Sequence, residues 1–223
     1  MSHATSADTV ESIEEMPHAT AVKKPEGWDR KMGLGRRLAV NMAVQEGAEF
    51  VLHIDLDRLT HWILSYEDEL IAVLKRDIPT HDFLIIGRTE RAFGTHPGQQ
   101  REPESDTNEA ISRALDMRVD VTSGCSSFRG DVGHAIVRMS ASSDFSSTDT
   151  EWPLLARLGG FTVGYIATEG LEFETPDRYA DCIAEIGYGA WVRELFDDAQ
   201  LAYRWQLARA SIDIIGHTLR KYG

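Results

Sequence analysis

Short apolar segments rich in β-forming residues alternate along this chain with segments of helical pattern. Two segments, 50–54 and 83–86, are short and apolar enough to predict buried strands, and 162–166 has a strand-like pattern as well. Amphipathic helical patterns lie between and after them. Because strands that alternate with helices build a sheet covered on both faces, the chain is predicted to have an α/β fold.

The remaining segments complete the predicted order of elements. Helices are predicted over 8–16, 29–45, 67–75, 109–117, 151–158 and 199–220. A short strand is predicted at 119–121, and 171–173 is a candidate extension of the sheet. The segments 93–106 and 140–148 hold glycine, proline or serine with little apolar content, which predicts loops, the first of them long and mobile.

Composition and charge exclude several classes of protein. Apolar residues make up 42% of the 223 residues, too many for a disordered chain, yet no run approaches 18 consecutive apolar residues. The 23 basic and 36 acidic residues give a net charge of −13, which argues against a nucleic-acid binder because such binding is dominated by cations. No secretory signal is visible, and Cys125 and Cys182 show neither zinc spacing nor a disulfide framework. A cytoplasmic location is therefore expected.

The sharpest local feature is Asp55-Leu56-Asp57, which directly follows the predicted strand 50–54. Ligands of open α/β sheets gather at the carboxyl ends of strands, and two carboxylates there can share a divalent cation that neutralises a diphosphate. The alternative is a pair of solvated turn residues that cap the next helix. The tripeptide alone does not decide between the two.

Two further segments have glycines or polar side chains next to predicted helices. Gly33 and Gly35, in Lys31-Met32-Gly33-Leu34-Gly35, open a helix where backbone could approach an anion, although a flexible turn has the same pattern. The polar segment 120–129 lies between a predicted strand and a helix, where turn chemistry is the alternative to ligand binding.

Asp149 and Glu151 stand at the start of a predicted helix. One of these carboxylates could act as a general base at a pocket rim. However, Thr148 and Glu151 have the spacing of a capping box, and Pro153 suits a first helical turn, so the residues alone favour a helix cap. His53 and His61 flank the Asp-x-Asp segment and are read as satisfied or surface histidines.

The C-terminal helical segment carries an apolar stripe with spacings of 4, 3, 4, 3 and 4, formed by Leu201, Trp205, Ala208, Ile212, Ile215 and Leu219. Such a stripe most often docks on its own domain. A homodimer or a peripheral contact with a membrane is the alternative.

In this order and spacing, five motifs resemble those of the polyprenol-phosphate sugar synthases of the dolichyl-phosphate mannose synthase type, which are family-2 glycosyltransferases of GT-A fold. The similar segments are the Lys-x-Gly-Leu-Gly turn at 31–35, Asp-x-Asp at 55–57, Ile-Gly-Arg at 86–88, the segment 120–129 that ends in Phe128-Arg129, and the carboxylate-bearing helix start at 149–151. The match runs over about 6–179.

The resemblance implies a GT-A-like domain over 31–180, with a mostly parallel sheet flanked by helices. A polar N-terminal segment would cover 1–30, and a C-terminal helical extension would cover 181–223. Relatives have further strands before the Lys-x-Gly-Leu-Gly turn that form most of the nucleotide pocket, so the domain is expected to be shortened at its N-terminus. The Ser-Lys of the family's acceptor segment is also missing, which leaves a polyprenol-phosphate acceptor open.

The implied activity is an inverting, metal-dependent transfer of a sugar from a nucleoside-diphosphate donor to a phosphate or hydroxyl acceptor. Mg²⁺ or Mn²⁺ would be held by Asp55 and Asp57, with Asp57 the better candidate for direct ligation. The donor or an acceptor phosphate would be bound by Gly33, Gly35, Arg88 and Arg129. Asp149 or Glu151 would be the base for a hydroxyl acceptor.

Two other functions remain open at this point. The domain could be a non-catalytic remnant that serves as an interaction module. A haloacid-dehalogenase-like phosphatase also has a strand followed by Asp-x-Asp, but its motif favours Thr or Val where Leu59 stands.

Overall fold

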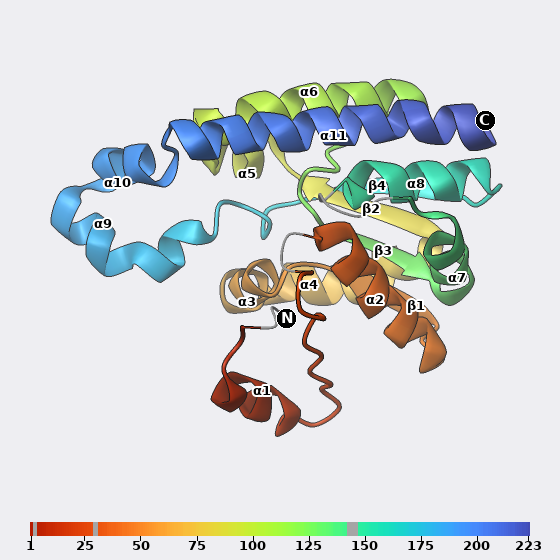
Figure 1. Cartoon of the computed structure of the whole chain (residues 1–223), viewed down its shortest axis with the longest axis horizontal. Coiled ribbons are helices and arrows are strands. Elements are labelled where there is room, and N and C mark those ends of the chain that lie inside the picture. Colours follow the sequence, from red (N-terminus) through yellow and green to blue (C-terminus); the bar gives the residue numbers. More distant parts are fainter. Residues whose placement is uncertain (2–3, 29–30, 142–146) are drawn as a thin grey trace.

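The computed structural model of the chain describes residues 1, 4–28, 31–141 and 147–223. Four strands form one mixed sheet in the order β1-β3-β2-β4 (Figure 1). Their bounds are β1 Phe50–His53, β2 Phe83–Arg88, β3 Ser126–Arg129 and β4 Val163–Thr168. The α/β fold predicted from the alternating pattern is confirmed.

The order of the strands corrects one prediction. β3 runs antiparallel to both β1 and β2, and only β2 and β4 form a parallel pair, so the sheet is mixed rather than mostly parallel. β3 comes from the segment 120–129, which was predicted to be a polar loop. The strand predicted at 119–121 and the extension at 171–173 are both wrong, since neither segment joins the sheet, although Val119, Val121 and Leu171 are buried.

Helices make up most of the described chain. Their bounds are α1 Ala7–Glu14, α2 Met32–Gln45, α3 Leu56–Ser65, α4 Glu67–Ala72, α5 Glu90–Thr95, α6 Gly98–Leu115, α7 Gly130–Met139, α8 Thr148–Leu158, α9 Ala180–Ile186, α10 Tyr188–Leu195 and α11 Asp198–Tyr222. A π-helical turn, Val73–Asp77, and a 3₁₀ turn, Ile78–Thr80, follow α4, and a second 3₁₀ turn, Thr175–Tyr179, precedes α9.

The two faces of the sheet are covered by different helices. Side chains alternate along β2, so Phe83 and Ile85 join a core formed with α2, α6, α7 and α8, whereas Leu84 and Ile86 join a core around Trp62 of α3. All six residues of β2 are buried. The sheet therefore lies between two layers, as the apolar strands predict.

The loop predicted over 93–106 is wrong, because α5 and the first half of α6 occupy this stretch. The side chains that α6 buries include Gln100, Pro103 and Thr107, followed by Ile111 and Leu115. Because the first three are not strongly apolar, the helical period is invisible in hydropathy. α6 packs along α11.

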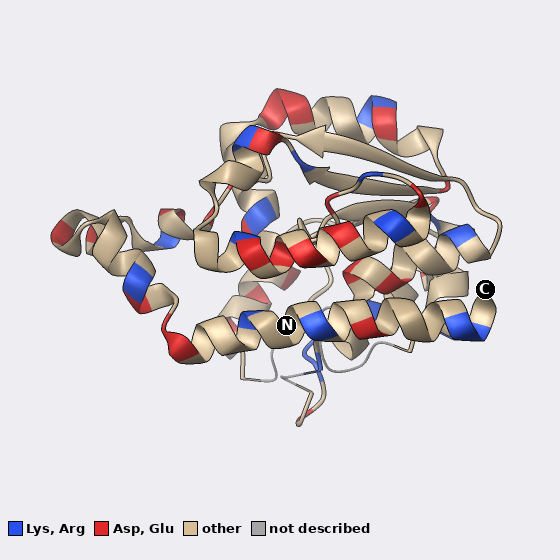
Figure 2. Ribbon diagram, turned by 90° about the horizontal axis from the view of Figure 1, so that it is seen from above, with Lys and Arg blue, Asp and Glu red and all other residues tan. Residues whose placement is uncertain are grey.

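The C-terminal helix is confirmed, but its buried face is rotated from the predicted stripe. α11 packs on α6 and α8 through Ala208, Ser211, Ile215 and Thr218. The stripe residues Trp205, Ile212 and Leu219 instead stay 42%, 39% and 39% exposed. α9 and α10 project to one side of the molecule, and acidic residues recur along α6 next to α11 (Figures 1 and 2).

None of the helices in the described part of the chain combines the length and the apolar character needed to cross a bilayer.

Candidate functional site

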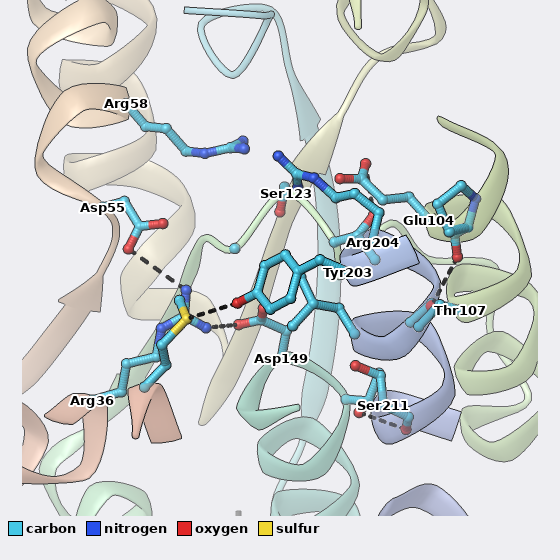
Figure 3. A pocket seen from close by; sticks show the side chains of 17 residues that line it. Arg36, Asp55, Arg58, Glu104, Thr107, Ser123, Asp149, Tyr203, Arg204 and Ser211 are labelled. Carbon is cyan, nitrogen blue, oxygen red and sulfur yellow. Dashed lines mark hydrogen bonds and ion pairs between the residues drawn. The ribbon is translucent and has the colours of Figure 1, made fainter. Parts of the chain in front are cut away.

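A groove opens beyond the C-terminal end of β1. Its inner cavity has a volume of about 260 Å³ and is lined by residues of α2, α3, α6, α8, α11 and the turn 122–124 (Figure 3). An adjoining cavity of about 370 Å³ shares three lining residues with it, Asp55, Arg58 and Arg204. The two cavities therefore adjoin along one charged boundary.

The strand register explains why these loops meet. His53 at the end of β1 pairs with Ser126 at the start of β3, so Asp55 and Gly124 arrive at the same edge. Gly124 has a φ of +69°, a left-handed conformation that favours glycine. A Cβ atom there would lie 3.8 Å from the Arg36 guanidinium and 4.0 Å from the Asp55 carboxylate, which places this turn directly against both charges.

Arg36 links two carboxylates on the groove floor. Its Nη1 donates to Asp149 Oδ1 at 2.7 Å and to Thr148 Oγ1 at 3.0 Å, and its Nη2 lies 3.6 Å from Asp55 Oδ1. Burial raises the pKa of Asp149, while Arg36 opposes the shift. The structure thus brings the predicted Asp55 and Asp149 together around an arginine that sequence reasoning did not single out.

Glu151 does not share this groove. Its carboxylate accepts hydrogen bonds from the hydroxyl of Ser140 and, at 2.6 Å, from the backbone N–H of Ala141, and the residue is buried. The capping-box prediction is also wrong, because Ser147 is the N-cap and makes no side-chain cap bond. Glu151 instead ties the end of α7 to α8, so Asp149 is the carboxylate of this helix start that reaches the groove.

Asp55 and Asp57 both reach solvent, with 51% and 42% of their side chains exposed, but they have different neighbours. Asp57 Oδ2 lies 3.8 Å from Arg178, and Asp57 lines the outer cavity, whereas Asp55 lines both cavities. In the described residues, no three His, Cys, Asp or Glu side chains gather where they could hold a metal ion. Mg²⁺ often binds proteins through one or two carboxylates, with the remaining positions taken by water and substrate phosphate. The exposed aspartates fit that kind of site and not a cage made by protein alone.

The two glycines of α2 lie near the groove without lining it. Gly33 is buried within the helix, and Gly35 borders a separate cavity beneath the N-terminal segment. A Cβ on Gly35 would come within 2.9 Å of the Lys24 side chain. Met32 and Arg36 of the same helix are the residues that line the groove.

Arg88 is committed to a buried network at the end of β2. Its Nε and Nη2 donate to Asp120 at 2.7 and 2.8 Å, and Nη2 also lies 2.9 Å from Glu104 Oε2. Burial by itself would raise the pKa of Asp120, but Arg88 holds it at about 2. With a side chain that is 0% exposed, Arg88 is not placed to bind a phosphate from solvent.

Arg129 and Asp55 lie at opposite ends of the strands. Because β3 is antiparallel, Arg129 pairs with Phe50 at the start of β1, about 10 Å along the strand from its end. Its guanidinium pairs with Asp82 and Asp131 there. Arg129 therefore does not share a site with Asp55 and Asp149.

The prediction that the histidines beside the Asp-x-Asp segment are satisfied or at the surface is confirmed for His61, whereas His53 is largely buried. His61 Nδ1 lies 2.6 Å from Asp177 Oδ2. His53 packs edge-on to Trp152 with ring centroids 5.2 Å apart, and burial, assisted by Arg36, lowers its pKa to about 3. His53 is therefore neutral beneath the groove.

Sequence reasoning missed the arginines of the groove: Arg36, Arg58 and Arg204. One signal was available for Arg58, which is the third residue of α3. A cation in the first turn opposes the helix dipole, so its presence there indicates another use. Arg204 stands among the stripe residues of α11 and has no comparable signal.

Comparison with known proteins leaves the site to be interpreted from its own geometry, because no protein-family model matches the chain and no curated protein or solved structure is significantly similar to it.

Proposed function

We propose that this chain is a metal-dependent glycosyltransferase that moves a sugar from a nucleoside-diphosphate donor to a hydroxyl or phosphate acceptor. One observation supports it above the others. A solvent-accessible carboxylate at a strand end, Asp55, and a buried carboxylate at a helix start, Asp149, contact the same arginine in one groove. The first suits a metal that carries a diphosphate, and the second suits a base.

Asp55 is the stronger candidate for metal ligation in this arrangement, because it borders both cavities, with Asp57 assisting from the outer one. Mg²⁺ or Mn²⁺ bound there would stabilise the negative charge that develops on the leaving diphosphate. Arg36 fixes the orientation of Asp55 and Asp149 from the floor of the groove.

Asp149 is placed to accept a proton from a hydroxyl acceptor. The acceptor oxygen would bond to the anomeric carbon as the bond from that carbon to the diphosphate breaks, with the electron pair leaving on the diphosphate and the proton passing to an Asp149 oxygen. The raised pKa of Asp149 makes it a better proton acceptor than an ordinary aspartate. A phosphate acceptor needs no base, so the effect of Asp149 separates the two acceptor classes.

The test is a thermal-shift screen against UDP-, GDP- and dTDP-sugars, each with and without Mn²⁺. A donor held at a hundred times its dissociation constant should raise Tm by about 5 to 10 °C. The rise should depend on Mn²⁺, disappear in Asp55→Asn and persist in Asp213→Asn, a control on the exposed side of α11.

Transfer itself is then followed as release of nucleoside diphosphate in the presence of candidate acceptors. Asp149→Asn should keep donor binding but lose turnover with a hydroxyl acceptor. A flat Tm across the panel contradicts the proposal and favours the interaction module. Release of inorganic phosphate from simple phosphate esters, without any nucleotide sugar, would instead favour the phosphatase.

A further inference from the structure

Arg58 and Arg204 approach each other from opposite walls of the groove. Arg58 belongs to α3 and Arg204 to α11, and their guanidinium ends point toward one another across the opening (Figure 3). In the described part of the chain, neither guanidinium makes an ion pair with a carboxylate. Arg58 Nη1 is moreover buried without a hydrogen-bond partner among those residues.

Two of the nearby carboxylates, Glu104 and Asp55, are engaged elsewhere, whereas Glu174 lines the outer cavity with a buried Oε2 that has no hydrogen-bond partner among the described residues. Glu104 influences Arg204, but its Oε2 pairs with Arg88 at 2.9 Å and its Oε1 accepts a hydrogen bond from Gln100 at 2.8 Å. Asp55 lies beside Arg36. Glu174 raises the pKa of Arg204, but among the described residues no carboxylate lies within ion-pair distance of either guanidinium.

The two like charges oppose each other in this partly buried setting, while Glu104 and Glu174 favour the charged form of Arg204. Burial lowers the pKa of Arg204, Glu104 opposes the shift, and Arg58 adds to it as a like charge. An arginine has five N–H donors in a planar fork that matches the oxygens of a phosphate. Two such forks that face one another across an open groove present donors from both sides to one tetrahedral anion.

We propose that Arg58 and Arg204 form a two-arginine clamp that binds a phosphate or diphosphate group. The clamp lies where the two cavities adjoin, beside Asp55, so the group can enter from the outer cavity. A bound anion bridges α3 to α11, two elements that are otherwise held by different packing layers. The clamp does not depend on glycosyl transfer, since any ligand that carries phosphate would satisfy it.

If an anion bridges the two arginines, the effect of removing either arginine on Tm should depend on whether the anion is present. Without anion, Arg58→Gln or Arg204→Gln removes one of two repelling charges, so Tm should stay equal or rise. With anion, the wild-type chain gains stability that neither variant gains. On adding the ligand, the Tm of the wild type should therefore come to exceed that of either variant.

The experiment uses the full chain with inorganic phosphate and inorganic pyrophosphate, each with and without Mg²⁺, measured by thermal shift and titration calorimetry. Arg58→Gln and Arg204→Gln should each weaken binding at least tenfold. Arg209→Gln, on the exposed side of α11, should bind like the wild type. Circular dichroism checks that the variants keep their helices.

The probes distinguish the source of the anion. Binding of pyrophosphate that requires Mg²⁺ and is lost in Asp55→Asn indicates the diphosphate of a nucleotide. Binding of phosphate that needs neither indicates a separate phosphate group. Absence of any anion-dependent shift, or an equal shift in wild type and both clamp variants, overturns the inference. Because the probes carry no sugar or nucleoside, failure of the glycosyltransferase proposal leaves this result unaffected.

Discussion

Two regions that contain arginines lie at the C-terminal ends of β1 and β2, and they differ in how many carboxylates pair with the guanidinium groups. At the end of β2, Arg88 is buried and bound by Asp120, Glu104 and Thr122. At the end of β1, the guanidinium groups of Arg58 and Arg204 face one another, and in the described chain neither has a carboxylate within ion-pair distance, although Arg204 lies over the Phe196 ring. With 36 acidic and 23 basic residues, the protein has no shortage of carboxylates. Arg58 and Arg88 each leave a buried Nη1 without a hydrogen-bond partner among the described residues, so the contrast lies in the carboxylates that pair with Arg88 and not with the groove arginines.

The largest expected effect is the loss of the Arg88 network. Arg88→Met leaves the Asp120 carboxylate buried without its cation and should lower the free energy of unfolding by about 3–5 kcal/mol. Arg129→Met, which removes only surface ion pairs, should cost less than about 1 kcal/mol. Urea denaturation measures both, and equal losses would remove the distinction between the two kinds of arginine.

Acid should destabilise both regions through one histidine each. Burial lowers the pKa of His96, near Arg88, to about 2 and that of His53, near Arg36, to about 3. Below pH 6.5 the unfolded chain therefore binds protons that the folded chain does not, and stability decreases as pH falls. Each such proton changes the unfolding free energy by about 1.4 kcal/mol per pH unit.

Denaturation at a series of pH values from 6.5 to 4.5 measures this slope. His96→Phe should reduce it by the share of one proton while retaining the stacking position next to Phe93 and Phe173. An unchanged slope in the variant would show that His96 is not held neutral in the fold.

A glycine in each region sharpens the comparison further. A Cβ on Gly87 would lie 2.6 Å from the Tyr165 ring and 2.8 Å from the carbonyl oxygen of Asp120, so Gly87→Ala should cost about 1–3 kcal/mol through overpacking. Gly124→Ala meets only ordinary contacts but has to adopt a positive φ, which costs about 1–2 kcal/mol. Crystal structures of both variants would check this, since only the first should displace Asp120.

The smallest expected effect is the direct coupling of the groove arginines. In a double-mutant cycle of Arg58→Gln and Arg204→Gln without anion, the coupling should be unfavourable in the wild type and of order 0.5–1 kcal/mol. High salt should reduce it only in part, because partly buried charges are screened less than exposed ones. A favourable coupling energy would mean that the two side chains are held together by something other than a ligand.

The fold was predictable where hydropathy has a clear period. The apolar runs at 50–54 and 83–86 gave β1 and β2, and the long C-terminal helix was found close to its observed bounds. β3 was missed because Ser126 and Ser127 interrupt its apolar pattern, although Ser127 is buried between two strands. The second half of α6 matches the helix predicted over 109–117, but its first half was missed because the side chains buried there are not strongly apolar. In both cases tertiary packing overrides the local signal.

The candidate site was predictable only as far as its pieces lie next to strand ends or helix starts. Asp55 and Asp149 were both found in this way, and the structure places them around Arg36. Arg129 lies away from the site because β3 is antiparallel to β1 and β2, and no local sequence pattern predicts that direction. Arg204 follows Arg58 by 146 positions in the chain, so neither local sequence predicts that the two side chains lie close together.

The net charge of −13 also affects how fast an anion reaches the groove. Long-range repulsion from the acidic surface, including the carboxylates along α6, slows the approach of a multiply charged ligand before it meets Arg58 and Arg204 (Figure 2). Added salt shortens the range of that repulsion to about 10 Å at 0.1 M, so the association rate constant should increase with ionic strength. A divalent cation that partly neutralises the ligand would speed its arrival in the same way, before any bond is broken.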